Sequence, residues 1–113
     1  MNHKKYLEQA AKIALKKIDR TYLMAALAVR KDGALISCRN GFPLEPNQLH
    51  HAEARLCRKL DTAETVFVAR ILRTGNIWAM ARPCDVCQIL LKSKHVKRVI
   101  YTIGPNEWGV LVL

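Results

Sequence analysis

Two short segments of the chain contain residue types that can bind a metal. Residues 49–57 read LHHAEARLC and residues 81–87 read ARPCDVC. Zinc in proteins is held by thiolate and imidazole ligands, and a catalytic zinc site keeps three protein ligands and leaves a fourth position for water. Cys84 and Cys87 are three residues apart, so both sulfur atoms can face one point in the first turn of a helix. The N-terminus of that helix favours the thiolate form of both residues.

The first segment offers the remaining parts of a hydrolytic zinc site. His51 can supply a third ligand, and Glu53 follows two residues later, where its carboxylate can reach the water on the metal. Zinc lowers the pKa of a bound water to about 7, and a nearby glutamate can move that proton to a substrate. His50 is an alternative ligand, but the spacing to Glu53 favours His51 and leaves His50 near the mouth of the site.

Each segment also has a simpler interpretation. A single Cys-x-x-Cys pair can be a redox pair or have no function, and a histidine in a helix is commonly an ordinary side chain. A further alternative is a binding module in which zinc is purely structural. Glu53 argues against this alternative, because a structural zinc site is closed by a fourth ligand and needs no unligated carboxylate. Together, the two segments favour an enzyme.

The hydrophobic pattern predicts the elements that position these residues. They are a helix at 3–18, strands at 22–30 and 34–38 around an Asp32-Gly33 turn, a loop at 40–50, a helix at 51–60, a strand at 65–71 with a short return at 77–81, a helix with Pro83 in its first turn, and strands at 96–103 and 108–113. This order indicates one sheet covered by helices. Only residues 104–107 separate the last two strands, which must be antiparallel, because a parallel pair needs a crossover of a dozen or more residues.

Length and composition limit the class of protein. The 113 residues fit a single domain, residues 1–113, and half of them are hydrophobic, so the chain can form a packed core. No apolar run approaches the roughly 18–20 residues that span a bilayer, and residues 1–20 lack the pattern of a secretory signal. We therefore expect a cytoplasmic protein without membrane association. In that reducing compartment the four cysteines are expected to be metal ligands or, for Cys38 and Cys57, small core residues.

The charge of the chain suggests a class of partner. Lys and Arg number 19 against 9 Asp and Glu, a formal net charge of +10, and they gather in residues 4–20 and 92–98. Such charge attracts the phosphates of nucleotides or nucleic acids. A solvated surface is the simpler explanation, since neither stretch is a patch in which aromatic residues alternate with basic ones.

The segments His51-Ala52-Glu53 and Pro83-Cys84-Asp85-Val86-Cys87 resemble the His-x-Glu and Pro-Cys-x-x-Cys signature of the cytidine deaminase superfamily. The resemblance extends to the order of elements along nearly the whole chain. It implies an α/β, three-layer fold with a mixed five-stranded sheet between helices, and a Zn²⁺-dependent hydrolytic deamination of a cytosine base. It also implies roles for six residues: His51, Cys84 and Cys87 bind zinc, Glu53 moves protons, Asn40 contacts the sugar, and the backbone amide of Ala52 holds the base.

The same resemblance bears on the substrate. In this superfamily an antiparallel last pair of strands is typical of the enzymes that act on free nucleosides, whereas tRNA-adenosine and polynucleotide-cytosine editors have a parallel pair. The short turn at 104–107 therefore favours a cytidine or deoxycytidine deaminase of pyrimidine salvage, and the positive charge extends the choice to their nucleotides. Phe42, close to Asn40, is the aromatic residue best placed to stack on the base.

Two expectations concern partners. The alternative substrate is cytosine in single-stranded DNA or RNA, with the basic stretches following the backbone. Members of the superfamily are commonly dimers or tetramers, so we also expect a homo-oligomer.

Overall fold

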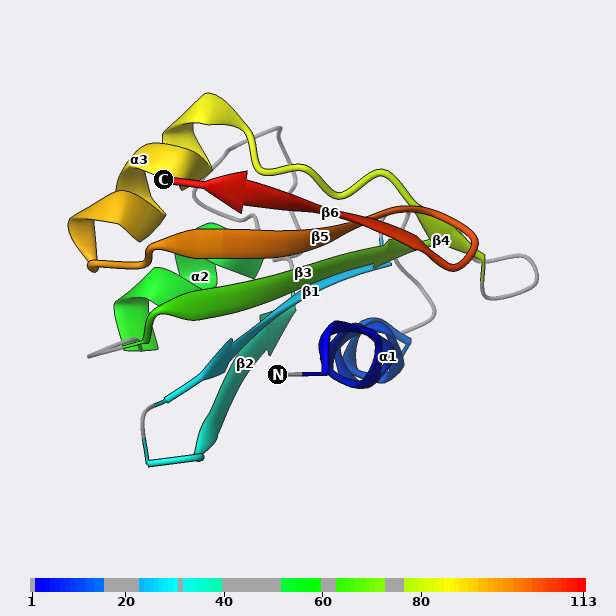
Figure 1. Cartoon of the computed structure of the whole chain (residues 1–113), viewed down its shortest axis with the longest axis horizontal. Coiled ribbons are helices and arrows are strands. Elements are labelled where there is room, and N and C mark those ends of the chain that lie inside the picture. Colours follow the sequence, from blue (N-terminus) through cyan, green and yellow to red (C-terminus); the bar gives the residue numbers. More distant parts are fainter. Residues whose placement is uncertain (1, 16–22, 31, 40–51, 60–62, 73–76) are drawn as a thin grey trace.

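In the computed structural model the chain forms one β-sheet with helices on both faces (Figure 1). The structure describes residues 2–15, 23–30, 32–39, 52–59, 63–72 and 77–113. Along the chain the elements are α1 (His3–Ala14), β1 (Leu23–Val29), β2 (Leu35–Arg39), α2 (Ala52–Lys59), β3 (Thr65–Ile71), β4 (Trp78–Ala79), α3 (Asp85–Ser93), β5 (Arg98–Gly104) and β6 (Glu107–Val112). Within these ranges no helix is long and apolar enough to cross a membrane.

The sheet is mixed and follows the order β2-β1-β3-β5-β6. β3 and β5 are parallel, and the other neighbouring strands are antiparallel. The antiparallel pairing of β5 and β6 confirms the prediction made from the short turn. The number of strands differs from the expected five, because the return after β3 pairs with it over two residues as β4, a sixth strand outside the main path.

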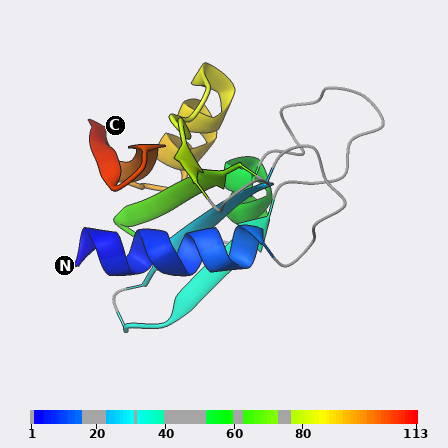
Figure 2. The ribbon, with the colours of Figure 1, turned by 90° about the vertical axis from the view of Figure 1, so that its right-hand side faces the viewer.

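The sheet is the middle of three layers. α1 covers one face, and α2 and α3 cover the other, as Figures 1 and 2 show. In β1 and β3 the odd-numbered residues pack under α1 and the even-numbered residues pack under α2 and α3. Because both faces are covered, these two strands are apolar almost throughout instead of alternating with polar residues.

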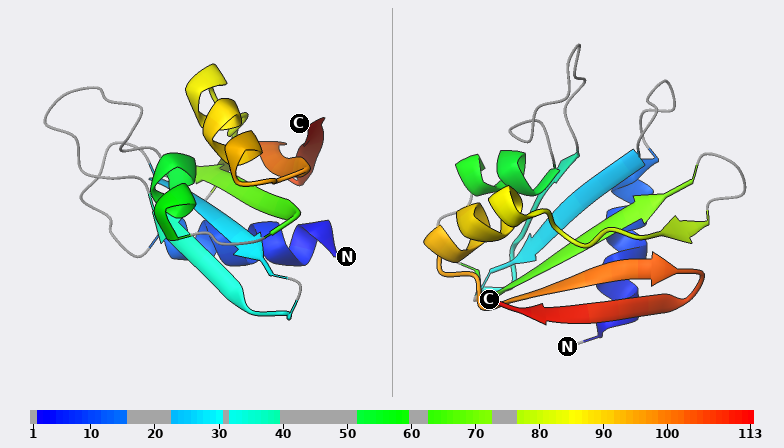
Figure 3. Two further views of the ribbon diagram at one scale, coloured as in Figure 1. Left: turned by 90° about the vertical axis from the view of Figure 1, so that its left-hand side faces the viewer. Right: turned by 90° about the horizontal axis from the view of Figure 1, so that it is seen from above.

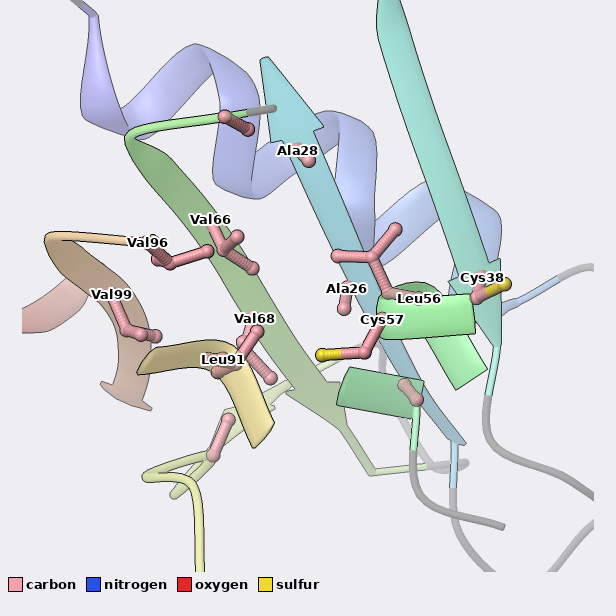
Figure 4. Packing of buried hydrophobic residues seen from close by; sticks show 13 residues of the cluster. Ala26, Ala28, Cys38, Leu56, Cys57, Val66, Val68, Leu91, Val96 and Val99 are labelled. Carbon is pink, nitrogen blue, oxygen red and sulfur yellow. The ribbon is translucent and has the colours of Figure 1, made fainter. Parts of the chain in front are cut away.

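The helices follow the amphipathic spacing that the sequence predicts. The buried residues of α1 recur at intervals of three and four: Leu7, Ala10, Ala11 and Ala14. On the other face, Figure 4 shows Cys57 of α2 and Leu91 of α3 in the same cluster as Val68 of β3. Cys38 and Cys57 are 8% and 4% exposed, which confirms that both are core residues.

Several element boundaries differ from the prediction. α1 ends at Ala14, with Leu15 as its C-cap, and residues 16–22 lie outside the described residues. α3 begins at Asp85, so Pro83 precedes the helix and does not occupy its first turn. β5 begins at Arg98 because the chain before it still completes the end of α3, where the N–H of Val96 donates to the C=O of Leu91 at 3.1 Å.

The first hairpin turn lies where the sequence predicts it. Gly33 has a φ of +88°, a conformation that glycine adopts without steric cost. The N–H of Arg30 donates to the C=O of Ala34 at 2.9 Å, and the side chain of Asp32 accepts from the N–H of Ala34 at 3.0 Å. These bonds close the turn between β1 and β2.

A fully buried threonine holds the segment that leads to α3. The hydroxyl of Thr102 accepts from the N–H of Arg70 at 3.1 Å and donates to the C=O of Ala79 at 2.7 Å. Its own C=O accepts from the N–H of Ala81 at 2.9 Å. Thr102 thereby ties β3, β5 and residues 79–81 together. Cys84 follows three residues after Ala81, so these bonds also fix the chain that leads to it.

Replacing Thr102 tests this role. Thr102→Val keeps the shape of the side chain but leaves the Arg70 N–H and the Ala79 C=O without their partner, so we expect the free energy of unfolding to fall by about 2 kcal/mol. Thr102→Ser keeps the hydroxyl and loses one buried methyl group, so it should cost less, about 1 kcal/mol. Urea unfolding of both variants measures the difference. A valine variant as stable as the natural protein would contradict this account.

Candidate metal and catalytic site

The two helices that carry the metal-binding segments lie next to each other on one face of the sheet (Figure 3). Glu53 is the second residue of α2. Cys84 is the N-cap of α3, and Cys87 is the third residue of that helix. The predicted carboxylate and the predicted thiols therefore all stand in the first turn of a helix or just before it.

A hydrogen bond joins the two segments. The Cys87 thiol donates to the Glu53 carboxylate, and both side chains are almost completely buried, with exposed fractions of 0% and 1%. Residues far apart in the sequence are thus in contact at one internal point. The sequence predicted that these residues share a site, and the structure brings them together.

The environment of Glu53 is unusual for a carboxyl group. Burial raises its pKa from 4.5 to about 7, against the opposing effect of hydrogen bonds from its own backbone N–H and from Cys87. Its Oε1 atom is buried and has no hydrogen-bond partner among the described residues. Because a buried oxygen without a partner is costly, this atom marks a place for a proton donor, a water or a cation.

The residues fit a zinc ion. Two thiols at a helix N-terminus are typical zinc ligands, and the side chain of Cys84 makes no capping hydrogen bond to its helix. Within the described residues, no group of three His, Cys, Asp or Glu side chains could hold a metal. His51, the third predicted ligand, precedes α2 in the sequence and lies outside these residues.

The remaining predicted site residues have different outcomes. His51, Asn40 and Phe42 lie outside the described residues, and their roles stay predictions. Ala52 is the first residue of α2, and its side chain is fully buried. A backbone amide in this first turn has no acceptor within its own helix, as the predicted contact to a base requires.

Cys57 is close to the site but differs from the two cysteines of α3. Burial raises the pKa of its thiol, Lys94 lowers it, and the nearby carboxylate of Glu53 raises it again. A thiol with a raised pKa stays neutral and is a poor metal ligand. Cys57 therefore belongs to the core of α2 and provides a control for experiments on Cys84 and Cys87.

Sequence reasoning missed two residues that support the site. The side-chain amide of Gln88 donates to the C=O of Pro83 at 2.8 Å, and Thr102 holds residues 79–81 as described above. Both fix the backbone that leads to Cys84. Gln88 is only five residues from its acceptor and could have been found as a neighbour of the Pro-Cys-x-x-Cys motif, whereas the bonds of Thr102 span 23 and 32 residues and leave no local pattern.

Comparison with known proteins identifies the architecture. No protein-family model matches the chain, and no curated protein matches it. Among solved structures, a cytidine deaminase from Burkholderia pseudomallei is similar over 99% of this chain and 93% of that chain, with a TM-score of 0.69 and 18% sequence identity. The chain has a cytidine deaminase-like fold. The mixed sheet between helices and the antiparallel last pair of strands agree with this fold.

The raised pKa of Glu53 predicts how the zinc-free protein responds to pH. The folded protein binds this proton more tightly than the unfolded chain, so the linked stability is fully present below pH 4.5 and is lost as the pH rises to about 7. We expect a loss on the order of 3 kcal/mol in the free energy of unfolding across this range. Urea unfolding in the presence of a chelator measures it. Glu53→Gln should lack this component, and an unchanged pH dependence in that variant would refute the assignment.

Proposed function

We propose that this protein is a zinc-dependent hydrolytic deaminase that converts the cytosine base of cytidine, deoxycytidine or their nucleotides to uracil and releases ammonia. The observation that carries the proposal is the buried hydrogen bond between Glu53 and Cys87. It places a carboxylate beside a thiol of the Cys-x-x-Cys motif, at the starts of two adjacent helices. The likeness of the fold to a cytidine deaminase supports the same assignment.

In this proposal His51, Cys84 and Cys87 hold the zinc ion, and Glu53 stays off the metal. Zinc would supply an activated water at neutral pH. Glu53 takes a proton from the attacking water and passes it to the ring nitrogen of the base. The bond between the ring carbon and the exocyclic nitrogen then breaks, and a second proton moved by Glu53 lets the amine leave as ammonia.

The surroundings of Glu53 suit this role. The side chain is 1% exposed, so bulk water does not compete for the protons that it moves. Its contact with Cys87 fixes the carboxylate beside a proposed zinc ligand, and Oε1 has no other partner among the described residues. In this proposal the backbone amide of Ala52, one residue earlier, holds the base.

The position of the basic residues favours a small substrate over a polynucleotide. The described lysines of the first basic stretch, Lys4, Lys5 and Lys12, lie exposed on α1, and α1 is on the opposite face of the sheet from α2 and α3 (Figure 1). The second stretch begins with Lys92 in the last turn of α3, the end opposite to Cys84. A nucleic acid strand following the described lysines of α1, or Lys92, would not pass the starts of α2 and α3.

One exposed basic residue is close to the site in sequence. Arg82 stands two residues before Cys84. A guanidinium group binds phosphate well, so Arg82 supports including nucleotides among the proposed substrates.

An activity measurement tests the reaction. We expect the zinc-loaded protein to deaminate cytidine, deoxycytidine or dCMP, measured as uracil formation and ammonia release. Glu53→Gln should lower the rate at least about a thousandfold, because it removes the proton carrier, while zinc stays bound. Activity only on a cytosine-containing single strand would show that the substrate is a polynucleotide and not a free nucleoside or nucleotide. Full activity in Glu53→Gln would refute the mechanism.

Zinc content tests the ligands independently of activity. Cys84→Ala and Cys87→Ala should each lose most of the bound zinc, measured by elemental analysis of purified protein, because each removes one of three ligands. Cys57→Ala is the matched control, a buried cysteine beside Glu53 that should keep one zinc per chain. Equal zinc contents in the Cys57 and Cys87 variants would contradict the proposed ligand set.

A further inference from the structure

Both tryptophans of the chain lie on the face of the sheet that α1 covers. Trp78 of β4 stands opposite Ile71, a residue buried under α1, and packs against the same cluster. In β6, Val110 stands opposite Ile100 of that cluster. Side chains two residues apart in a strand share a face, so Trp108 points to the same side as Val110.

The two tryptophans are also at the same end of the sheet. Thr102 of β5 stands opposite Trp108, and its hydroxyl donates to the C=O of Ala79, the residue after Trp78. Only β5 therefore separates the two tryptophans, which corresponds to two strand spacings, about 10 Å. Trp108 is 37% exposed and Trp78 is half-buried, so each ring has a part that a ligand can reach.

The lysines of α1 adjoin these rings. Lys4 and Glu8 line a hollow of about 390 Å³ together with Trp78 and the turn before β6. The same two residues line a second hollow of about 330 Å³, which Lys5 and Lys12 also line, so the two hollows are neighbours. All three lysines are exposed, and no ion pair between described residues engages them. Glu8 is the one acidic residue of the helix.

We propose that this tryptophan–lysine surface, formed by Lys4, Lys5, Lys12, Trp78 and Trp108, binds single-stranded nucleic acid. Lysines attract the phosphates of the backbone, and accessible aromatic rings stack on unpaired bases. A duplex offers the same phosphates, but its bases are already stacked on one another. The sequence did not show this combination, because the aromatic residues belong to β4 and β6 and the lysines to α1.

The surface is separate from the candidate site. α1 lies on the opposite face of the sheet from α2 and α3 (Figure 1). A strand bound beside α1 contacts neither Glu53 nor the cysteines of α3, so its bases are not substrates. The surface instead anchors the protein to a nucleic acid. This inference does not rest on the proposed deaminase function, and either can fail without the other.

Anisotropy of a labelled oligothymidylate of about 12 nucleotides, titrated with the zinc-loaded protein, tests the contribution of charge. Thymine has no exocyclic amine, so the proposed reaction cannot act on this probe. We expect the logarithm of the binding constant to fall with the logarithm of the salt concentration with a slope of about −2, as three phosphate contacts predict. Lys4→Glu should raise the dissociation constant about tenfold, and Glu8→Gln should lower it.

Lys92→Glu is the matched control for Lys4→Glu. It makes the same change of charge at an exposed lysine in the last turn of α3, on the other face of the sheet. It should change the dissociation constant less than about twofold. Absence of binding by the natural protein, or equal losses in the Lys4 and Lys92 variants, would overturn the proposal.

Tryptophan fluorescence tests the stacking, since both tryptophans of the chain belong to the surface. The oligothymidylate should quench this fluorescence, whereas inorganic polyphosphate, which has charge but no bases, should not. Trp108→Leu should weaken binding about tenfold, and a duplex of the same length should bind the natural protein at least about tenfold more weakly than the single strand. Binding without quenching, or a duplex bound as tightly as the single strand, would overturn the proposal.

An oligouridylate of the same length compares RNA with DNA. Contacts to phosphates and to the faces of bases do not use the 2′-hydroxyl, so we expect the two strands to bind within about threefold of each other. A difference of more than about tenfold would contradict binding by these two kinds of contact. Turnover of cytidine in Lys4→Glu and Trp108→Leu should equal that of the natural protein, which separates this test from the test of the proposed function.

Discussion

A carboxyl group buried against a thiol is the constraint on which the rest of this structure depends. Glu53 is inside the protein and retains an oxygen with no partner among the described residues. Such a group is tolerated only where its surroundings fix it and a further partner can reach it. Its contact with Cys87 requires the starts of α2 and α3 to adjoin. Three parts of the fold keep these two helix starts together. They are the sheet, the return strand β4 and the chain before α3.

The helices are divided between the two faces of the sheet, and this division lets the starts of α2 and α3 adjoin. α1 completes the core on one face, so the other face is open to two short helices placed side by side. Thr102 and Gln88 then fix the backbone that enters α3. Neither residue touches the proposed reaction, yet both determine where Cys84 stands. Hydrogen bonds made by residues outside the two motifs therefore contribute as much to the position of the candidate site as the motifs do.

Much of this arrangement could be predicted from the sequence, and the reasons are local. Apolar runs gave the positions of β1 and β3, helical spacing gave α1, and the four residues at 104–107 required the last pair of strands to be antiparallel. The return at 77–81 was predicted as well, although only Trp78–Ala79 of it pairs with β3. The bonds of Thr102 could not be predicted, because they join residues remote in the chain and leave no periodic pattern. The proximity of Glu53 to Cys87 was predicted from the pairing of two motifs, whereas His51, Asn40 and Phe42 lie outside the described residues.

The position of α1 has a consequence for how a protein of this fold can change. The described lysines of α1 and the buried carboxylate of α2 are on opposite faces of one sheet. Substitutions that alter the charge of α1 need not alter the distances or burial at the starts of α2 and α3. Surface charge and chemistry can therefore diverge independently, and two chains with the same site can differ widely in isoelectric point. The charge of α1 and the candidate site therefore lie on opposite faces of the sheet.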